Sequence, residues 1–279
     1  MEQVRNLGGW GLKPAFEWVR VTSIGSVAER TFVIAFKGPK SASALAPGQF
    51  CMISPPPGSS NVYLPRPFSY YRVAAEDTIE ILFRTFGRAT RWMAGLAPGD
   101  RIGVFGPLGN TFNQQPDAER VILAGGGIGI PPIVFLAQIL SRLADPPQID
   151  LIYGEACGSR VVDLAKVVPS SVRSHLTTED GKIGVKGLVS EELGRILETC
   201  KTPPAVYTCG PRAMMAAVAG MLTPEKVALF ETACEENMAC GRGICQGCVI
   251  PVKAPEDATR YVCCCTEGPV FNGFEVKWD

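Results

Sequence analysis

The sequence predicts a β-barrel followed by an α/β domain, with a small cysteine-rich domain at the end. Three observations support this prediction. β-Branched and aromatic runs, each bounded by Gly, Pro or Ser, recur at short intervals through residues 1–113. Strand-like and helix-like runs then alternate through residues 114–225, a pattern typical of a parallel sheet. Seven of the eleven cysteines fall within residues 226–279, where we expect irregular structure.

Composition and charge disfavour several classes of protein. The 279 residues carry 27 basic and 27 acidic side chains, so no charge excess favours nucleic acid or an anionic membrane. Hydrophobic residues make up 46% of the chain, enough for packed cores in two domains. Residues 121–140 are uncharged and long enough to span a bilayer. Four glycines and the pair Pro131-Pro132 favour a strand, a turn and a helix there instead.

The cysteine count and the first residues indicate a reducing compartment. The opening MEQVRNLGGWGLKP has no apolar core of the kind that a secretory signal contains. An odd number of cysteines fits complete disulfide pairing poorly. We therefore expect a cytoplasmic protein without a disulfide framework. Cys51, Cys157, Cys200 and Cys234 are expected to be small buried residues.

Five strands and one helix are expected in the barrel. The strand-like runs are FEWVRVTSIG (16–25), RTFVIAFKG (30–38), GQFCMIS (48–54), TIEILFR (78–84) and DRIGVFG (100–106). The helical segment RATRWMAGL (88–96) precedes the turn signal APGD.

The α/β domain is expected to begin after Pro116-Asp117. Its runs are RVILAGGGIGIPPIVFLAQILSRL (120–143), QIDLIYGEA (148–156), SHLTTEDG (174–181) and PAVYTCGPRAMMAAVAGML (204–222). The first and last of these read as a strand, a turn and a helix, and the two between them read as strands.

Two glycine-containing turns in this domain are candidates for a nucleotide site. AGGGIGIPP, with Gly125, Gly127 and Gly129, follows a strand and opens a helix, where glycines let the backbone approach a phosphate. Ile130 interrupts the G-x-G-x-x-G pattern, so a plain turn without ligand is the alternative. The second turn, Cys209-Gly210-Pro211, also follows a strand, and ligands gather at the carboxyl ends of parallel strands.

Two segments of the barrel also carry groups suited to a nucleotide. In LPRPFSYY, Arg66 could clamp a phosphate, Ser69 could donate to it and Tyr70 could stack on a flat ring. In RTFGRATRW, Gly87 and Thr90 stand at the start of the expected helix. Taken singly, each group is better explained by strand and turn structure.

Cys240, Cys245 and Cys248 have the spacing C-x4-C-x2-C, the pattern of plant-type [2Fe–2S] proteins. Gly241 and Gly243 can adopt positive φ and let the loop wrap round a cluster, and Gly247 can serve the same end. A structural zinc site more often shows two C-x2-C pairs, and only Cys245 and Cys248 have that spacing here. The spacing therefore favours iron–sulfur over zinc.

The order of the motifs resembles that of the ferredoxin–NADP reductase superfamily. The motifs are APGQF, RPFS, FGRAT, GDRIGVFGPLGN, AGGGIGIPP, YG, TEDG and YTCGP. With MACGRGICQGC and CTEGPVF added, the chain resembles the electron-transfer subunits of type B dihydroorotate dehydrogenase over about residues 15–275. The resemblance implies an FAD-binding barrel (1–113), an NAD-binding domain (114–225) and a [2Fe–2S] domain (226–279).

The resemblance also implies roles for particular residues. It assigns Arg66, Pro67, Phe68, Ser69, Gly87 and Thr90 to FAD, and Gly125, Gly127, Gly129, Cys209, Gly210 and Pro211 to NAD(H). In the family the last cluster cysteine stands two residues before an acidic-Gly-Pro sequence, which selects Cys265 as the fourth ligand. Cys263 is the alternative, because alternation along an extended segment would point it to the same side.

Hydride exchange with FAD and single-electron transfer through the cluster are the implied chemistry. The implied partner is an FMN-containing dihydroorotate dehydrogenase catalytic subunit, in a hetero-oligomer that makes orotate for pyrimidine biosynthesis. The alternatives are a reductase that serves an oxygenase, a sulfide-metabolising complex or a ferredoxin, and a non-catalytic zinc module. Lone His175 is expected to have no catalytic role, and Glu179 and Asp180 to be solvated. Glu155 mildly favours NAD over NADP, since a carboxylate would repel a 2′-phosphate, whereas nearby Arg160 favours NADP.

Overall fold

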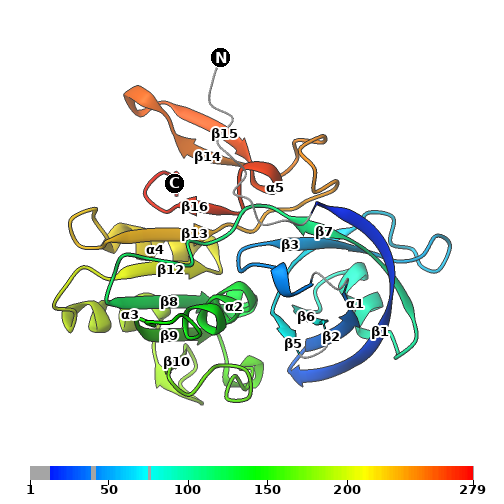
Figure 1. Ribbon diagram of the computed structural model, residues 1–279, viewed down its shortest axis with the longest axis horizontal. Helices are drawn as coiled ribbons and strands as arrows, with labels where there is room; N and C mark the ends of the chain where they lie inside the picture. The colour runs from blue at the N-terminus through cyan, green and yellow to red at the C-terminus, as the bar shows by residue number, and fades with distance from the viewer. Residues whose placement is uncertain (1–12, 39–41, 75–76, 279) are drawn as a thin grey trace.

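The computed structural model describes residues 13–38, 42–74 and 77–278 (Figure 1). Within them the chain forms two seven-stranded sheets and one two-stranded hairpin. The barrel and the α/β domain lie side by side, and the C-terminal hairpin lies above both in the view of Figure 1. The predicted succession of an antiparallel barrel and a parallel α/β domain is confirmed.

The first sheet is antiparallel, with the spatial order β4-β3-β7-β1-β2-β6-β5. Its strands are β1 (Ala15–Ala28), β2 (Thr31–Lys37), β3 (Phe50–Ser54), β4 (Arg66–Ser69), β5 (Arg72–Ala74), β6 (Thr78–Arg84) and β7 (Arg101–Leu108). The helices of this part are the 3-10 turn η1 (Ala42–Ala44) and the predicted helix α1 (Arg88–Ala94). Because β4 and β5 lie at opposite ends of the order but only two residues apart in the chain, the sheet must curl until its edges meet.

The side chains of β6 point alternately into the barrel and out of it. Ile79, Ile81 and Phe83 belong to the core inside the barrel. Leu82 and Arg84 point to the opposite face, as successive strand residues must, and Leu82 packs into the core of the α/β domain. The strand therefore fills the barrel with one set of side chains and joins the second domain with the other.

The second sheet has the spatial order β11-β10-β9-β8-β12-β13-β16 and is parallel except at β16. Its strands are β8 (Arg120–Gly126), β9 (Gln148–Glu155), β10 (Arg173–Thr178), β11 (Val185–Lys186), β12 (Ala205–Cys209), β13 (Leu229–Ala233) and β16 (Val270–Asn272). The helices of this domain are η2 (Gly127–Gly129), α2 (Ile130–Leu140), η3 (Gly158–Arg160), α3 (Val189–Glu198) and α4 (Arg212–Met221).

Helices cover both faces of this sheet. Helix α2 packs on the face that also contacts the barrel, where ten of its eleven residues are buried. Helices α3 and α4 pack on the other face against Ile122, Ile152 and Val206. The uncharged stretch 121–140 is thus a strand, a turn and a helix, as predicted, and none of the described helices is long and apolar enough to cross a membrane. Helix α3 was not anticipated from the sequence.

The C-terminal segment is more ordered than the sequence suggested. It includes the hairpin of β14 (Val249–Lys253) and β15 (Thr259–Cys263), the turn η4 (Pro255–Asp257) and the short helix α5 (Cys264–Glu267). Strands β13 and β16 lie within residues 226–279, yet they complete the parallel sheet. The expectation of irregular structure was wrong for these strands, because β13 is too short to show periodicity and gains its stability from its neighbour β12.

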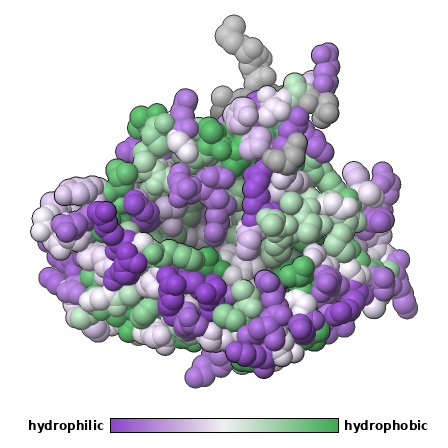
Figure 2. All heavy atoms as spheres, turned by 180° about the vertical axis from the view of Figure 1, so that it is seen from behind, coloured by the Kyte–Doolittle hydropathy of each residue, from purple (hydrophilic) through white to green (hydrophobic). Residues whose placement is uncertain are grey.

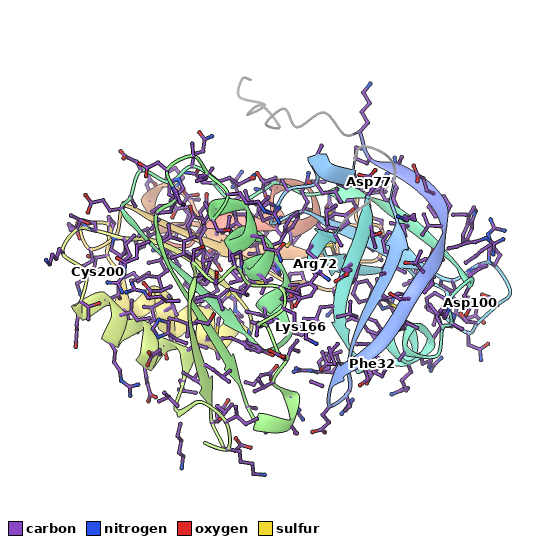
Figure 3. The ribbon with its side chains drawn as sticks, turned by 60° about the horizontal axis from the view of Figure 1, so that its bottom comes forward. Phe32, Arg72, Asp77, Asp100, Lys166 and Cys200 are labelled. Carbon is purple, nitrogen blue, oxygen red and sulfur yellow. The ribbon has the colours of Figure 1, made fainter. Side chains whose placement is uncertain are left out.

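The eleven cysteines are free thiols. Cys51 and Cys234 are buried, as predicted, whereas Cys157 and Cys200 are only half-buried and the prediction of burial was wrong for them. Figure 3 places Cys200 at the side of the α/β domain away from the barrel. On the face seen in Figure 2, hydrophilic side chains are spread among smaller hydrophobic patches.

Candidate functional site

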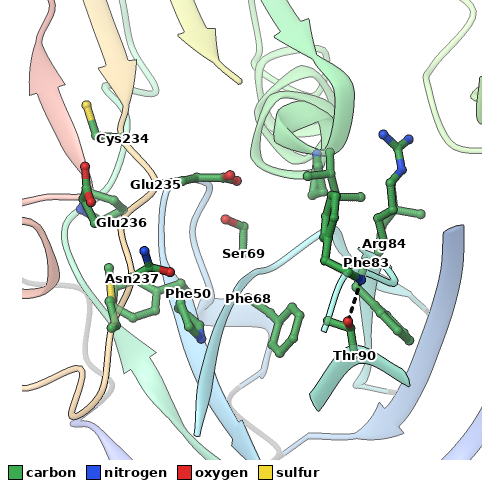
Figure 4. Close-up of a pocket in the computed structure, with 17 residues that line it drawn as sticks. Phe50, Phe68, Ser69, Phe83, Arg84, Thr90, Cys234, Glu235, Glu236 and Asn237 are labelled. Atoms are coloured by element: carbon green, nitrogen blue, oxygen red, sulfur yellow. Dashed lines mark hydrogen bonds between the residues drawn. The ribbon is translucent and has the colours of Figure 1, made fainter. Parts of the chain in front are cut away.

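A cavity of about 420 Å³ lies where all three parts of the chain meet (Figure 4). The barrel, the first turn of the α/β domain and the segment after β13 each contribute to its wall. Its lining residues are Phe50, Pro67, Phe68, Ser69, Leu82, Phe83, Arg84, Phe86, Thr90, Ile128, Pro131, Cys234, Glu235, Glu236, Asn237, Met238 and Pro269. Apolar and aromatic walls with a few polar groups are typical of a cofactor site.

Three of the four residues of the RPFS strand line the cavity, and Arg66 does not. Pro67, Phe68 and Ser69 line the cavity. The exposed guanidinium of Arg66 instead donates from Nη1 to the carbonyl oxygens of Leu64 and Pro65, each at 3.0 Å. The other two guanidinium nitrogens can still donate to an anion, because both of these bonds come from Nη1.

Tyr70 does not line the cavity. It is 2% exposed and packs inside the barrel core beside Cys51. Burial raises the pKa of its hydroxyl well above the ordinary value. The structure therefore places the ring that was expected to stack on a ligand in the barrel core, and not among the residues that line the cavity.

The start of α1 forms another part of the cavity wall. Gly87 precedes the helix, and the Thr90 hydroxyl accepts hydrogen bonds from the N–H groups of Phe86 (2.9 Å) and Gly87 (3.2 Å). The first of these bonds is the dashed line in Figure 4. Thr90 thus fixes the turn that presents Phe86, whose side chain is 64% exposed, to the cavity.

The two glycine turns meet at the carboxyl edge of the parallel sheet. Strands β8 and β12 are neighbours, but the chain leaves β8 towards β9 on its other side, so a topological switch point lies between them. A Cβ on Gly129 would lie 2.5 Å from Cα of Gly210, and one on Gly210 would lie 2.9 Å from the backbone of Gly126. Only glycines allow this approach, which leaves a backbone-lined cradle at the switch point.

Replacing Gly129 with alanine is expected to disturb this cradle. The added methyl group would collide with the backbone of Gly210, and overpacking of this kind costs about 1–3 kcal/mol. We expect the KM for NADH to rise about tenfold while the flavin content stays unchanged. Gly220→Ala in α4 is the matched control, because a Cβ there meets nothing within 4 Å. Equal KM values for the two variants would contradict the role of the cradle.

Backbone N–H groups in the loop between Cys234 and Cys248 point at cysteine sulfur. Cys240 Sγ accepts from the N–H groups of Arg242 (3.4 Å) and Cys245 (3.5 Å). These N–H groups, that of Cys245 first, lower the pKa of the Cys240 thiol to about 6. Since iron is bound by thiolate, the loop favours the form that binds it.

Cys265 lies in the same loop environment. Its Sγ accepts from the N–H group of Gly243 at 3.1 Å. Burial raises the pKa of its thiol to about 12, a penalty that a coordinated cation would offset. Cys264 points elsewhere, because its Sγ donates to the carbonyl oxygen of Cys234 at 3.1 Å. Cys263 is half-buried and stands opposite Val249 in the hairpin.

Positive φ angles bend the loop as predicted at Gly241 (67°) and Gly243 (74°). The third such residue is Gln246 (52°) rather than the expected Gly247. Gly241 packs against Met52 and Leu108 of the barrel, so the loop is seated on the antiparallel sheet. Among the described residues, no three His, Cys or acidic side chains converge as a single metal ion would require.

Residues 234–238 belong to the cavity but were not predicted. Glu235 is exposed to solvent and directs its carboxyl group towards Ser69 (Figure 4). Met238 lines the cavity and also packs in the core that contains Cys248 and Cys265. No local motif marks these residues, because they reach the cavity only when the C-terminal segment folds back onto the barrel.

Acidic residues of the α/β domain are engaged within the protein. Glu155, which we expected to favour NAD through the ribose, is buried in an ion pair with Arg84. Asp180 is exposed, as predicted, and its carboxylate also accepts from the N–H groups of Gly158 and Lys182. His175 bridges Asp150 and Glu192, which lie outside the cavity lining.

Comparison with known proteins identifies the family. Residues 235–277 match the model of the iron–sulfur cluster binding domain of dihydroorotate dehydrogenase B. The dihydroorotate dehydrogenase B (NAD(+)) electron transfer subunit of Desulforamulus reducens is 32% identical over 262 residues, which are 93% of this chain and 97% of that protein. The chain belongs to this family of electron-transfer subunits.

Solved structures share the fold of the family. A chain of the NADH-dependent reduced ferredoxin–NADP oxidoreductase has a TM-score of 0.80 at 23% identity, over 93% of this chain and 90% of that one. A ferredoxin NADP⁺ reductase from Neisseria gonorrhoeae with bound FAD and NADP has a TM-score of 0.62 at 18% identity, over 78% and 98% of the two chains. The fold is therefore that of the ferredoxin–NADP reductases, with an iron–sulfur domain added at the C-terminus.

Proposed function

We propose that this chain transfers electrons between NAD(H) and the catalytic subunit of a dihydroorotate dehydrogenase, by way of FAD and a [2Fe–2S] cluster. The observation that carries the proposal is the meeting of three sites in one fold. The cavity of about 420 Å³ is lined by Cys234 and Met238 at the start of the cysteine loop, and by Ile128 and Pro131 from the turn and helix that follow β8 and lead from the glycine cradle. Membership of the family supports the same function.

The flavin is assigned to the cavity. Pro67, Phe68 and Ser69 would hold it from β4, and Thr90 with Gly87 would hold it from the start of α1. Arg66 would reach its phosphates with the N–H groups that the carbonyls of Leu64 and Pro65 leave unused. The aromatic lining fits a flat, largely apolar ring system.

NAD(H) is assigned to the cradle and the cluster to the cysteine loop. Gly125, Gly127 and Gly129 would face the nucleotide with Gly210 and Pro211, while Cys209 closes the end of β12. Cys240, Cys245, Cys248 and Cys265 are assigned as the cluster ligands, because backbone N–H groups already point at two of these sulfurs. Cys245 is exposed, which fits a centre that exchanges electrons with another protein.

The bound cofactors would supply the conversion of a two-electron hydride into single electrons. The chain's own residues position and shield this chemistry. The loop N–H groups stabilise negative charge on the sulfurs.

The partner and the place of action complete the proposal. We propose an FMN-containing catalytic subunit, joined to this chain in a hetero-oligomer of the cytoplasm, where free thiols are maintained. Orotate formation for pyrimidine biosynthesis would occur on that partner. A reductase that serves another acceptor is the alternative, and co-purification of an FMN protein distinguishes the two.

Anaerobic purification and cofactor analysis test the function. We expect about one FAD, two irons and two acid-labile sulfides per chain. The isolated protein should oxidise NADH with artificial acceptors but form no orotate from dihydroorotate. Zinc without sulfide or flavin, or orotate made by this chain alone, would overturn the proposal.

A further inference from the structure

A buried ion pair joins the barrel to the α/β domain. Arg84, the last residue of β6, donates from Nη2 to Glu155 Oε1 at 2.5 Å and from Nη1 to Oε2 at 3.3 Å. Glu155 is the last residue of β9, and the two side chains are 8% and 2% exposed. The pair is thus bidentate, shielded from water and shared between the two domains.

Further hydrogen bonds fix both members of the pair. On the barrel side, Arg84 Nε donates to Thr31 Oγ1 at 3.1 Å. On the α/β side, the Tyr153 hydroxyl donates to Glu155 Oε1 at 3.0 Å, and the carbonyl oxygen of Arg160 accepts from Arg84 Nη2 at 3.4 Å. Because each group is held by its own domain, the ion pair transmits the position of one domain to the other.

The pair also lies beside both proposed cofactor sites. Arg84 lines the flavin cavity, and its Nη1 is the nearest atom to a Cβ built on Gly127, at 3.9 Å. Gly127 belongs to the turn assigned to NAD(H) and has a φ of 54°. A second contact reinforces this side of the junction, where the N–H group of Glu29 donates to the carbonyl oxygen of Ser159 at 2.9 Å.

We propose that Arg84 and Glu155 are positioning residues that set the distance between the nucleotide turn and the flavin cavity. The inference rests on the proposed function, since it concerns hydride exchange between the two sites. Hydride transfer requires the reacting atoms to be held at close range, so a small displacement of one domain reduces its rate steeply. Glu155 carries this role through Arg84, without lining the cavity itself.

Glu155→Gln is the first test, because it keeps the side chain's shape and removes its charge. In stopped-flow experiments at saturating NADH, flavin reduction is expected to slow at least tenfold, while the KM for NADH changes less than threefold and the FAD content stays near one. The same variant, as the holoprotein, should show faster amide hydrogen exchange in residues 158–162. A merely local structural role would speed this exchange but leave the rate of flavin reduction unchanged.

The Arg72–Glu80 pair provides a matched control. It is also bidentate, with bonds of 2.6 and 2.8 Å, but it joins β5 to β6 within the barrel. Glu80→Gln should leave the rate of flavin reduction within twofold of the natural protein. An equal slowing in Glu80→Gln and Glu155→Gln would overturn the inference, because any lost ion pair would then explain the result.

The double variant Arg84→Met/Glu155→Gln separates positioning from stability. Removing both charges should restore much of the thermal stability lost on removing one, because no unpaired buried charge remains. The rate of flavin reduction should stay low, since the domains lose their directional contact. Recovery of the rate together with stability would overturn the inference. Absence of FAD or NADH oxidation in the natural protein would instead refute the proposed function.

Discussion

Replacing Cys265 with alanine is expected to abolish the [2Fe–2S] cluster and with it electron transfer to the partner. Cys265 Sγ accepts the Gly243 N–H group from the loop that carries the other three proposed ligands. Without this thiolate, one iron would have an open position and the cluster would be lost during purification. We expect less than a tenth of the iron and sulfide, with the FAD content and NADH oxidation by artificial acceptors retained.

The neighbouring cysteines are the matched controls for this prediction. Cys263→Ala removes the thiol that stands opposite Val249, and Cys264→Ala removes the one that donates to the carbonyl oxygen of Cys234. Both variants should keep about two irons per chain and the cluster's visible absorption. Loss of the cluster in Cys263→Ala with retention in Cys265→Ala would assign the fourth ligand to Cys263 instead.

Replacing Glu231 with glutamine is expected to stabilise the protein above pH 7. Desolvation raises the pKa of this carboxyl from 4.5 to about 7, although its Oε2 accepts the N–H group of Asn113 at 2.8 Å. The folded state therefore binds the proton more tightly than the unfolded state does. At 1.36 kcal/mol per pKa unit, the largest expected effect is about 3 kcal/mol.

The direction in which stability changes with pH follows from the raised pKa of Glu231. The contribution of Glu231 to the free energy of unfolding is fully present below pH 4.5 and is lost as the pH rises through about 7. Thermal unfolding at pH 8 should thus show a melting temperature several degrees higher in Glu231→Gln, and little difference at pH 5. Glu198→Gln, on the exposed side of α3, is the control and should change neither value by much. An equal shift at both pH values would contradict the explanation.

The strongest predictions from sequence concerned features that neighbouring residues determine. The spacing of Cys240, Cys245 and Cys248 and the glycines between them predicted the bent loop, and positive φ at Gly241 and Gly243 confirms it. The glycine turns were visible because each follows a buried strand and precedes a helix. The prediction that Tyr70 would stack on a ligand rested on LPRPFSYY alone, and the alternation in this segment does not reveal that Tyr70 lies in the barrel core.

The sequence by itself determined the order of the parts, the strands and helices of strong pattern, and the cysteine spacing, because these depend on residues close together in the chain. The tertiary structure alone decided which distant residues meet. The return of residues 234–238 to the cavity, the approach of Gly129 to Gly210 and the pairing of Arg84 with Glu155 each join segments tens of residues apart. Such contacts form only when burial of both domain cores brings the segments together, so no local pattern records them.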